Sequence, residues 1–160
     1  LKNKNIRKTY LAIVHGKIKK IKGSIDLPLV KEKVGNNEKM IVDFSKGLKS
    51  ITKYKFLEYS KGFSLVLLFP ITGRTHQLRV HMSSLGHPIL GDKKYNDTSK
   101  IDYEFKNPSL MLHCLQMSFP NQKLKEKLIR AEINQKFYRT LKILKMENNK
   151  SLLEERFNYE

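Results

Sequence analysis

Apolar residues fall into short extended runs along the first part of the chain. KTYLAIVH at 8–15 is rich in β-branched and aromatic residues and is followed by Gly16, which predicts a strand. KSITKYKFLEYS at 49–60 alternates imperfectly and predicts a second strand, joined by a KGF turn to SLVLLFP at 64–70. That last run is almost continuously apolar, which predicts a strand covered on both faces.

Two shorter pieces lie between these strands. GSIDLPLV at 23–30 is predicted to be extended, and Pro28 favours an edge position because proline cannot donate to a strand ladder. KEKVGNNEKMIVD at 31–43 contains a Gly-Asn-Asn turn signal between two further extended arms.

The apolar period changes after Thr72-Gly73. RTHQLRVHMSSLG at 74–86 is predicted to be a helix that ends at Gly86, and its buried stripe is Leu78, Met82 and Leu85. Strand, tight turn and helix therefore follow one another here.

The remainder of the chain is predicted to contain a loop, a strand and a helix. The loop-rich connection at 89–108 leads to SLMLHCLQMSF at 109–119, which predicts a strand that ends before Pro120. The segment 123–146 has helical character, and its candidate buried positions are Leu124, Leu128, Phe137, Leu141 and Leu144.

These elements predict an α+β fold with a mixed, mostly antiparallel sheet and flanking helices. The chain has 160 residues, enough for one core, and we assign 1–145 to the domain and 146–160 to a polar tail. No run approaches the length of a membrane span. Cys114, the one cysteine, lies among apolar residues and is expected to be a small buried hydrophobe in a reducing, cytoplasmic compartment.

The net charge of the chain also predicts a class of binding partner. Lys and Arg number 32 against 15 Asp and Glu, a net charge of +17. Such a surplus favours a polyanion, nucleic acid first and an anionic membrane second. An AT-rich genome would also produce a Lys- and Asn-rich chain. Because the lysines are spread along the whole sequence, they favour a folded basic face over a basic tail.

Several kinds of chemistry are not expected. His76 and His81 are five residues apart and do not share a helix face, and no H-E-x-x-H or C-x-x-C occurs, so we expect no metal. No P-loop or G-x-G-x-x-G occurs either. His113 and Cys114 are adjacent on a strand and point to opposite faces, which argues against a Cys–His pair.

Arginine and tyrosine are the stronger candidates. Arg74 and Arg79 point in different directions on the expected helix, so one could track a phosphate while the other pairs with a carboxylate. The alternative is two solvated surface arginines. Tyr10 is either a core tyrosine or a residue that stacks on a base.

PITGRTHQLRVHMSSLGHPILGDKKY at 70–95 resembles the signature of the RluA-type pseudouridine synthases. RKTYLAIVHGKI is similar to that family's K-x-Y strand, GSIDLPL to its next segment, and LMLHCLQMSF to its L-x-L-H-A strand. The resemblance covers residues 7–120, and the spacing is closest to the RluC branch, which modifies bacterial 23S rRNA.

The resemblance implies a cofactor-free isomerase that detaches uracil at N1 and rejoins it through C5, acting on a uridine flipped out of RNA. Tyr10 is expected to pack against the base, and Arg79 to pair with the catalytic aspartate and hold it ionised. Arg74, His76 and Gln77 are expected to support the uridine pocket and the RNA. The complete protein is expected to be a cytoplasmic monomer with 23S rRNA as its partner and no metal.

The family's nucleophilic aspartate lies in an H-R-L-D-x-x-T-S-G motif ahead of the tyrosine strand. The 160 residues contain no such motif, and Asp92 lies within the signature but not at the nucleophile position. We therefore name no catalytic residue, and expect the aspartate upstream of residue 1 and the chain alone to be inactive.

Two other functions fit parts of the sequence. One is a non-catalytic RNA-binding remnant of a split or decayed synthase gene. The other is a helix-turn-helix DNA-binding module, which fits the charge but not the strands around the best helix. Without preceding strands, the sheet is also expected to leave residues 65–69 poorly covered and the chain poorly soluble.

Overall fold

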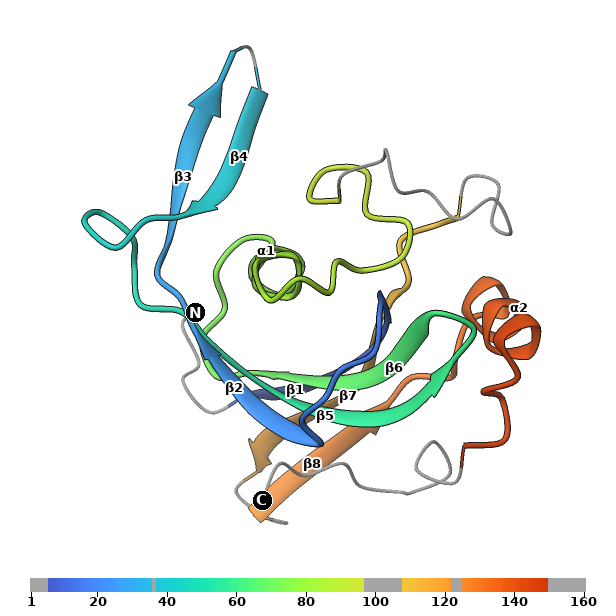
Figure 1. Cartoon of the computed structure of the whole chain (residues 1–160). Coiled ribbons are helices and arrows are strands. Elements are labelled where there is room, and N and C mark those ends of the chain that lie inside the picture. Colours follow the sequence, from blue (N-terminus) through green and yellow to red (C-terminus); the bar gives the residue numbers. More distant parts are fainter. Residues whose placement is uncertain (1–5, 36, 97–107, 122–124, 150–160) are drawn as a thin grey trace.

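A six-stranded sheet, ordered β2-β5-β6-β1-β7-β8, forms the centre of the computed structural model (Figure 1). The structure describes residues 6–35, 37–96, 108–121 and 125–149. All strand pairings within this part are antiparallel, so the α+β class is confirmed without a parallel pair there. The strands of the sheet are β1 (Arg7–His15), β2 (Lys22–Asp26), β5 (Ile51–Ser60), β6 (Phe63–Pro70), β7 (Leu112–Asn121) and β8 (Lys125–Arg130).

A separate hairpin projects from the sheet (Figure 1). It consists of β3 (Leu29–Val34) and β4 (Asn37–Val42). The predicted turn between them is confirmed, and Gly35 has a φ of 61°, which glycine adopts without steric cost. The extended piece 23–30 is divided between β2 and β3, with Pro28 at the break and β2 at the edge of the sheet.

β6 is buried on both faces, as its apolar run predicted. Leu65, Val66, Leu67 and Leu68 are all between 0% and 1% exposed. The expectation that residues 65–69 would be poorly covered is wrong, because β6 lies between β5 and β1 and side chains from two helices join its core cluster.

The register places Tyr10 on the face of the sheet that carries helix α1 (Gln77–Ser84). The Thr52 hydroxyl contacts α1 side chains, and Tyr54, two residues along β5, shares its face. Tyr54 is paired with Leu68, which is paired in turn with Tyr10. Cross-strand partners point to the same side, so Tyr10 and α1 lie on the same side of the sheet.

Helix α2 (Gln135–Leu144) packs against the opposite face. Leu11 follows Tyr10 and points the other way, and its partner across the β1–β7 ladder is His113. The ring of His113 lies 6.2 Å from that of Phe137 in α2. The sheet is thus a middle layer between the two helices.

The helix predicted at 74–86 is shorter in the structure. It begins at Gln77, and Leu78 and Met82 are buried as predicted. The prediction that Leu85 is buried is wrong: it is the C-cap of the helix and is 40% exposed, although its N–H still bonds to the His81 carbonyl at 3.0 Å. Gly86 is the predicted stop: its φ is 82°, and the next N–H bonds back to the Met82 carbonyl.

The helix predicted at 123–146 is half wrong. Residues 125–130 form β8, because the free edge of β7 pairs with them and this pairing overrides helix propensity. Asn134 caps α2 by accepting from the Phe137 N–H at 3.0 Å. The prediction that the strand at 109–119 ends before Pro120 is also wrong: β7 continues to Asn121, because its pairing with β8 extends that far. Of the candidate buried positions, Phe137, Leu141 and Leu144 are buried, Leu128 is half-buried, and Leu124 lies outside the described residues.

The predicted polar tail begins with a core residue. Met146 is fully buried and its N–H bonds to the Leu141 carbonyl. Residues 150–160 lie outside the described part, so the division into domain and tail stays a prediction.

Candidate functional site

Tyr10 lies half-buried in β1, where the β1–β7 ladder has a bulge between Thr9 and Tyr10. Its cross-strand partner is Cys114, which is half-buried rather than fully buried as expected. Burial raises the pKa of the Tyr10 hydroxyl, and the neighbouring Cys114 raises it further. Tyr10 is therefore a neutral aromatic ring with one polar end.

Arg79 and Asp92 form a bidentate ion pair. Arg79 Nε lies 2.7 Å from Asp92 Oδ2 and Nη2 lies 2.7 Å from Oδ1. The Asp92 side chain is 0% exposed and that of Arg79 is 17% exposed. Asp92 Oδ1 also accepts the N–H groups of Lys94 and Tyr95, both at 3.0 Å.

These contacts keep Asp92 ionised. Burial by itself raises the pKa of the carboxyl group, but the Arg79 hydrogen bonds and the two backbone donors outweigh it and the pKa is lowered. The same pairing raises the pKa of Arg79. Arg79 was expected to hold a catalytic aspartate; in the described chain its carboxylate partner is Asp92, which is fully engaged and inaccessible to a substrate.

Tyr95 connects this ion pair to its surroundings. The Arg79 guanidinium carbon lies 4.9 Å from the Tyr95 ring centroid. The Tyr95 hydroxyl lies 2.9 Å from His76 Nδ1 and accepts the Met40 N–H of β4 at 3.1 Å. Tyr95 is 7% exposed. One buried ring thus joins the hairpin, the start of α1 and Arg79.

His76 lies directly before α1 in a left-handed conformation, with a φ of 51°. Its side chain makes no capping hydrogen bond to the start of the helix and contacts the Tyr95 hydroxyl instead. Burial lowers the pKa of His76, Arg79 and Lys94 lower it further, and Asp92 opposes them. The imidazole is therefore neutral at neutral pH.

Gln77 is buried, at 3% exposure, and its amide is saturated. Oε1 accepts the Thr72 hydroxyl at 2.7 Å and the Arg74 N–H at 3.0 Å. Nε2 donates to the Ile51 carbonyl and to Thr52 Oγ1, both at 3.0 Å. An amide offers two donors and two acceptor sites, so no capacity remains for RNA. Gln77 fixes the turn ahead of α1, and any support it gives the uridine pocket is indirect.

His81 is fully buried between α1 and the sheet. Its Nδ1 lies 2.9 Å from Thr52 Oγ1 and its Nε2 lies 3.0 Å from the Leu27 carbonyl. Burial lowers its pKa, although the Leu27 hydrogen bond and Asp26 oppose this shift. Both ring nitrogens are used, which makes His81 a structural residue.

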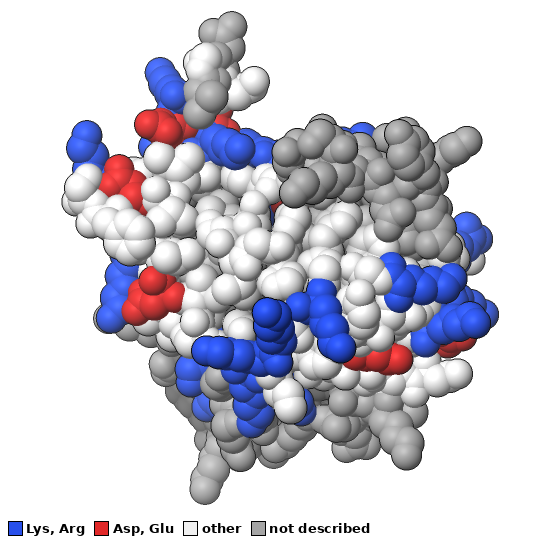
Figure 2. All heavy atoms as spheres, in the orientation of Figure 1, with Lys and Arg blue, Asp and Glu red and all other residues white. Residues whose placement is uncertain are grey.

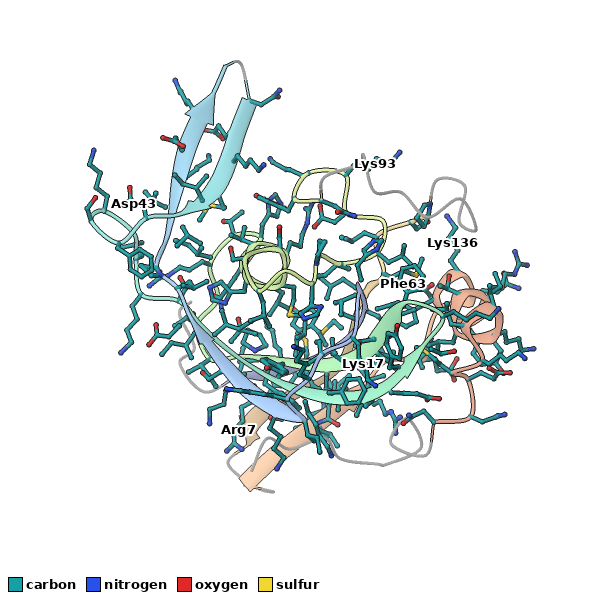
Figure 3. All side chains as sticks on the ribbon, viewed as in Figure 1. Arg7, Lys17, Asp43, Phe63, Lys93 and Lys136 are labelled. Atoms are coloured by element: carbon teal, nitrogen blue, oxygen red, sulfur yellow. The ribbon has the colours of Figure 1, made fainter. Side chains whose placement is uncertain are left out.

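Arg74 lies outside the helix, on the exposed turn before it, and its Nε donates to the Lys49 carbonyl at 3.4 Å. In Figure 3 the side chains crowd between α1 and the sheet, while Lys93, next to Asp92, lies at the outer rim on the α1 side.

Over the described ranges there is no group of three His, Cys, Asp or Glu residues that could hold a metal ion. Neither described helix has the length and apolar character needed to cross a bilayer.

The structure brings some of the predicted site residues together. His76 and Arg79 both contact Tyr95, and Tyr10 lies on the same side of the sheet. Arg74 lies on the exposed turn before α1, and its side chain contacts the Lys49 carbonyl. Among the described residues, Tyr10 makes no hydrogen bond or ring contact with Arg79.

The sequence interpretation missed the roles of Asp92 and Tyr95. Asp92 accepts from the second and third residues after it, the pattern of an Asx turn, so the Asp-Lys-Lys-Tyr order within the signature was a usable signal. The long-range contact with Arg79 had no signal in local pattern.

Comparisons with known proteins match this chain to one family. The family model described as RNA pseudouridylate synthase matches residues 1–84, a span that includes Tyr10 and Arg79. Ribosomal large subunit pseudouridine synthase C of Buchnera aphidicola subsp. Baizongia pistaciae is 38% identical over 149 residues, which is 90% of this chain and 47% of the relative. Dual-specificity RNA pseudouridine synthase RluA of Vibrio cholerae is 39% identical over 112 residues, covering 70% of this chain and 44% of the relative.

Solved structures agree with the sequence relatives. The structure of human RNA pseudouridylate synthase domain containing 1 has a TM-score of 0.71 and 32% identity, and the match covers 88% of this chain and 59% of that one. The chain spans less than half the length of the two curated relatives named above. Since the family model matches more than half of the residues, the chain belongs to the RNA pseudouridylate synthase family.

Proposed function

We propose that this chain forms the uridine-binding part of an enzyme that isomerises uridine to pseudouridine in RNA. The observation that carries the proposal is the placement of Tyr10 and of the anchored Arg79 on the same side of the sheet, within the span matched by the family model. Tyr10 offers an aromatic face to a base, and Arg79 offers a fixed positive charge on the same side of the sheet.

The reaction needs no oxidant or reductant. The bond from uracil N1 to ribose C1′ breaks, the base turns, and a bond from C5 to C1′ forms. C5 then loses its proton to water and N1 gains a proton from water, so the product is an isomer of the substrate. In this scheme Tyr10 holds the base during its rotation, and Arg79 stabilises negative charge near it. Asp92 is unsuited to act as a nucleophile, because its side chain is 0% exposed and both oxygens accept hydrogen bonds.

We propose large-subunit ribosomal RNA as the substrate, a cytoplasmic location, and a monomer as the working form of the whole protein. The substrate follows the name of the Buchnera relative. Lys and Arg side chains gather over the lower part of the face shown in Figure 2, where Figure 1 places β2 and β5. Lys22 of β2 stands directly opposite Lys55 of β5. Lys55 follows Tyr54 in β5, so this pair points to the face of the sheet opposite to α1 and Tyr10, where it adds to the basic surface of the protein and not to the uridine site itself.

Tritium release from 23S rRNA labelled at uridine C5 tests the proposal. The H-R-L-D motif has no counterpart in the 160 residues, so we expect no release by the chain alone. Release should appear when a family member's H-R-L-D-containing segment is added, and should be lost again in the Tyr10→Leu variant. Robust turnover by the chain alone would show that another residue serves as the nucleophile.

A second candidate, a non-catalytic RNA-binding remnant, is favoured by the net charge of +17 alone. This candidate predicts RNA binding that weakens steeply between about 50 and about 200 mM salt. It also predicts no isomerisation when a family member's H-R-L-D-containing segment is added. Undetectable binding at low salt would exclude this candidate.

A further inference from the structure

The Tyr95 hydroxyl is shared by two neighbours from different parts of the chain. The Met40 N–H lies 3.1 Å from the hydroxyl oxygen, and His76 Nδ1 lies 2.9 Å from it. The backbone that carries this side chain is held in turn: the Tyr95 N–H donates to Asp92, and the Tyr95 carbonyl accepts the Ser83 hydroxyl at 2.6 Å. The hydroxyl is thus fixed in space.

Proton counting assigns the tautomer of His76. The Met40 amide can only donate, so it occupies a lone pair of the hydroxyl oxygen and leaves the phenolic proton for His76. His76 then accepts at Nδ1 and carries its own proton on Nε2. The reverse arrangement, with Nδ1–H donating, would leave the phenolic proton of a residue that is 7% exposed without an acceptor.

The surrounding charges agree with a neutral imidazole. Arg79 of α1 and Lys94 of the following turn disfavour a further positive charge on His76, and only Asp92 opposes them. Lys39 of β4 adds another cation, 5.3 Å from the Tyr95 ring centroid. Within the described ranges, His76 Nε2 makes no hydrogen bond, so its N–H is available to a ligand.

We propose that Tyr95 is a positioning residue of the uridine site. Its hydroxyl holds His76 in the Nε2–H tautomer, which donates to an oxygen of the bound RNA, and its ring holds the Arg79 guanidinium in place against Asp92. The RNA half of this inference rests on the proposed function, whereas the tautomer follows from the intramolecular contacts.

Nitrogen-resolved NMR of the histidine rings in the full chain tests the tautomer. Wild-type His76 should show the Nε2–H form. Tyr95→Phe keeps the ring but removes the phenolic proton, so His76 should become a tautomer mixture with an upward-shifted titration midpoint. Tyr138→Phe, on the exposed surface of α2, is the matched control and should leave His76 unchanged. An Nδ1–H form in the wild type, or no change in Tyr95→Phe, would overturn the proposal.

Fluorescence anisotropy with a short uridine-containing single-stranded RNA tests the second half. Tyr95→Phe should weaken binding about fivefold, as expected for one lost hydrogen bond. In a His76→Gln background, whose side-chain amide donates without help from Tyr95, the same substitution should change affinity less than about twofold. Equal losses in both backgrounds would exclude action through His76. If the wild type binds no RNA, the proposed function and the RNA half fail together, while the NMR result still decides the tautomer.

Discussion

Arg79 and Asp92 join helix α1 to the turn that follows it through two parallel hydrogen bonds of 2.7 Å each. The carboxylate is fully buried and the guanidinium is mostly buried, so neither charge is solvated if its partner is removed. The pair therefore has two consequences that can be separated: it stabilises the fold, and it fixes a positive charge at the candidate site.

We expect Arg79→Met to lower the free energy of unfolding by about 3 kcal/mol, because it leaves Asp92 as a buried charge with backbone donors alone. Urea denaturation followed by circular dichroism measures this. Arg74→Met, on the exposed turn, is the control and should change stability by less than about 0.5 kcal/mol. If Arg79→Met also changed the free energy of unfolding by less than about 0.5 kcal/mol, water would be replacing the guanidinium as the partner of Asp92 without loss of stability.

We expect Gln77→Met to destabilise the protein by about 2 kcal/mol, because it removes four hydrogen bonds and leaves their buried partners unsatisfied. The exposed Gln135→Met provides a matched control with little effect. At a temperature where both variants are folded, their RNA affinity should equal that of the wild type. A selective loss of affinity in folded Gln77→Met would show that Gln77 contacts RNA after all.

We expect stability to fall as the pH is lowered from about 7.5 to about 5.5. The pKa values of His76 and His81 are lowered in the folded protein, so the unfolded chain binds more protons below its own histidine pKa of about 6.5. The free energy of unfolding is therefore largest above that pKa and decreases below it. The fall in the urea midpoint should be smaller in His81→Gln. An unchanged midpoint in the wild type would argue against buried neutral histidines.

We expect Tyr10→Leu to weaken binding of a short uridine-containing RNA by about 5- to 150-fold, the range for one lost base–aromatic stack. Tyr10→Phe keeps the ring and should remain within about twofold of the wild type. Tyr138→Leu, on an exposed tyrosine of α2, tests for non-specific effects. Fluorescence anisotropy measures all three. If Tyr10→Leu binds as the wild type does, Tyr10 is a core residue only.

The local sequence pattern predicted correctly those strands whose own residues favour a buried extended backbone. β1 and β6 have sequences that only a buried strand suits, and the hairpin turn at Gly35 needs a left-handed backbone. β8 was missed because KEKLIR carries no strong strand signal and becomes a strand by pairing with β7. The burial of Leu85 was predicted wrongly because helical spacing does not show how far neighbouring elements cover the last turn of a helix.

The site was predictable only in part, for a similar reason. The signature named Arg74, His76, Gln77 and Arg79, but it could not separate residues that face a ligand from residues that support them. That separation depends on long-range hydrogen bonds: Gln77 Nε2 donates to two residues of β5, and Arg79 Nε and Nη2 donate to Asp92, thirteen residues further along the chain.

The central place of β1 has a consequence for motion. Its amides pair with β6 and β7 on both sides, so we expect them to exchange with solvent only when the whole domain unfolds. The β3–β4 hairpin forms a separate two-stranded sheet, and its amides should exchange through local opening. The hydrogen bond from the Met40 N–H to the Tyr95 hydroxyl should break in this local opening, which needs less free energy than global unfolding. We therefore expect the Met40 amide to exchange before the amides of β1 do, while Tyr95 keeps its contacts with Asp92, Ser83 and Arg79.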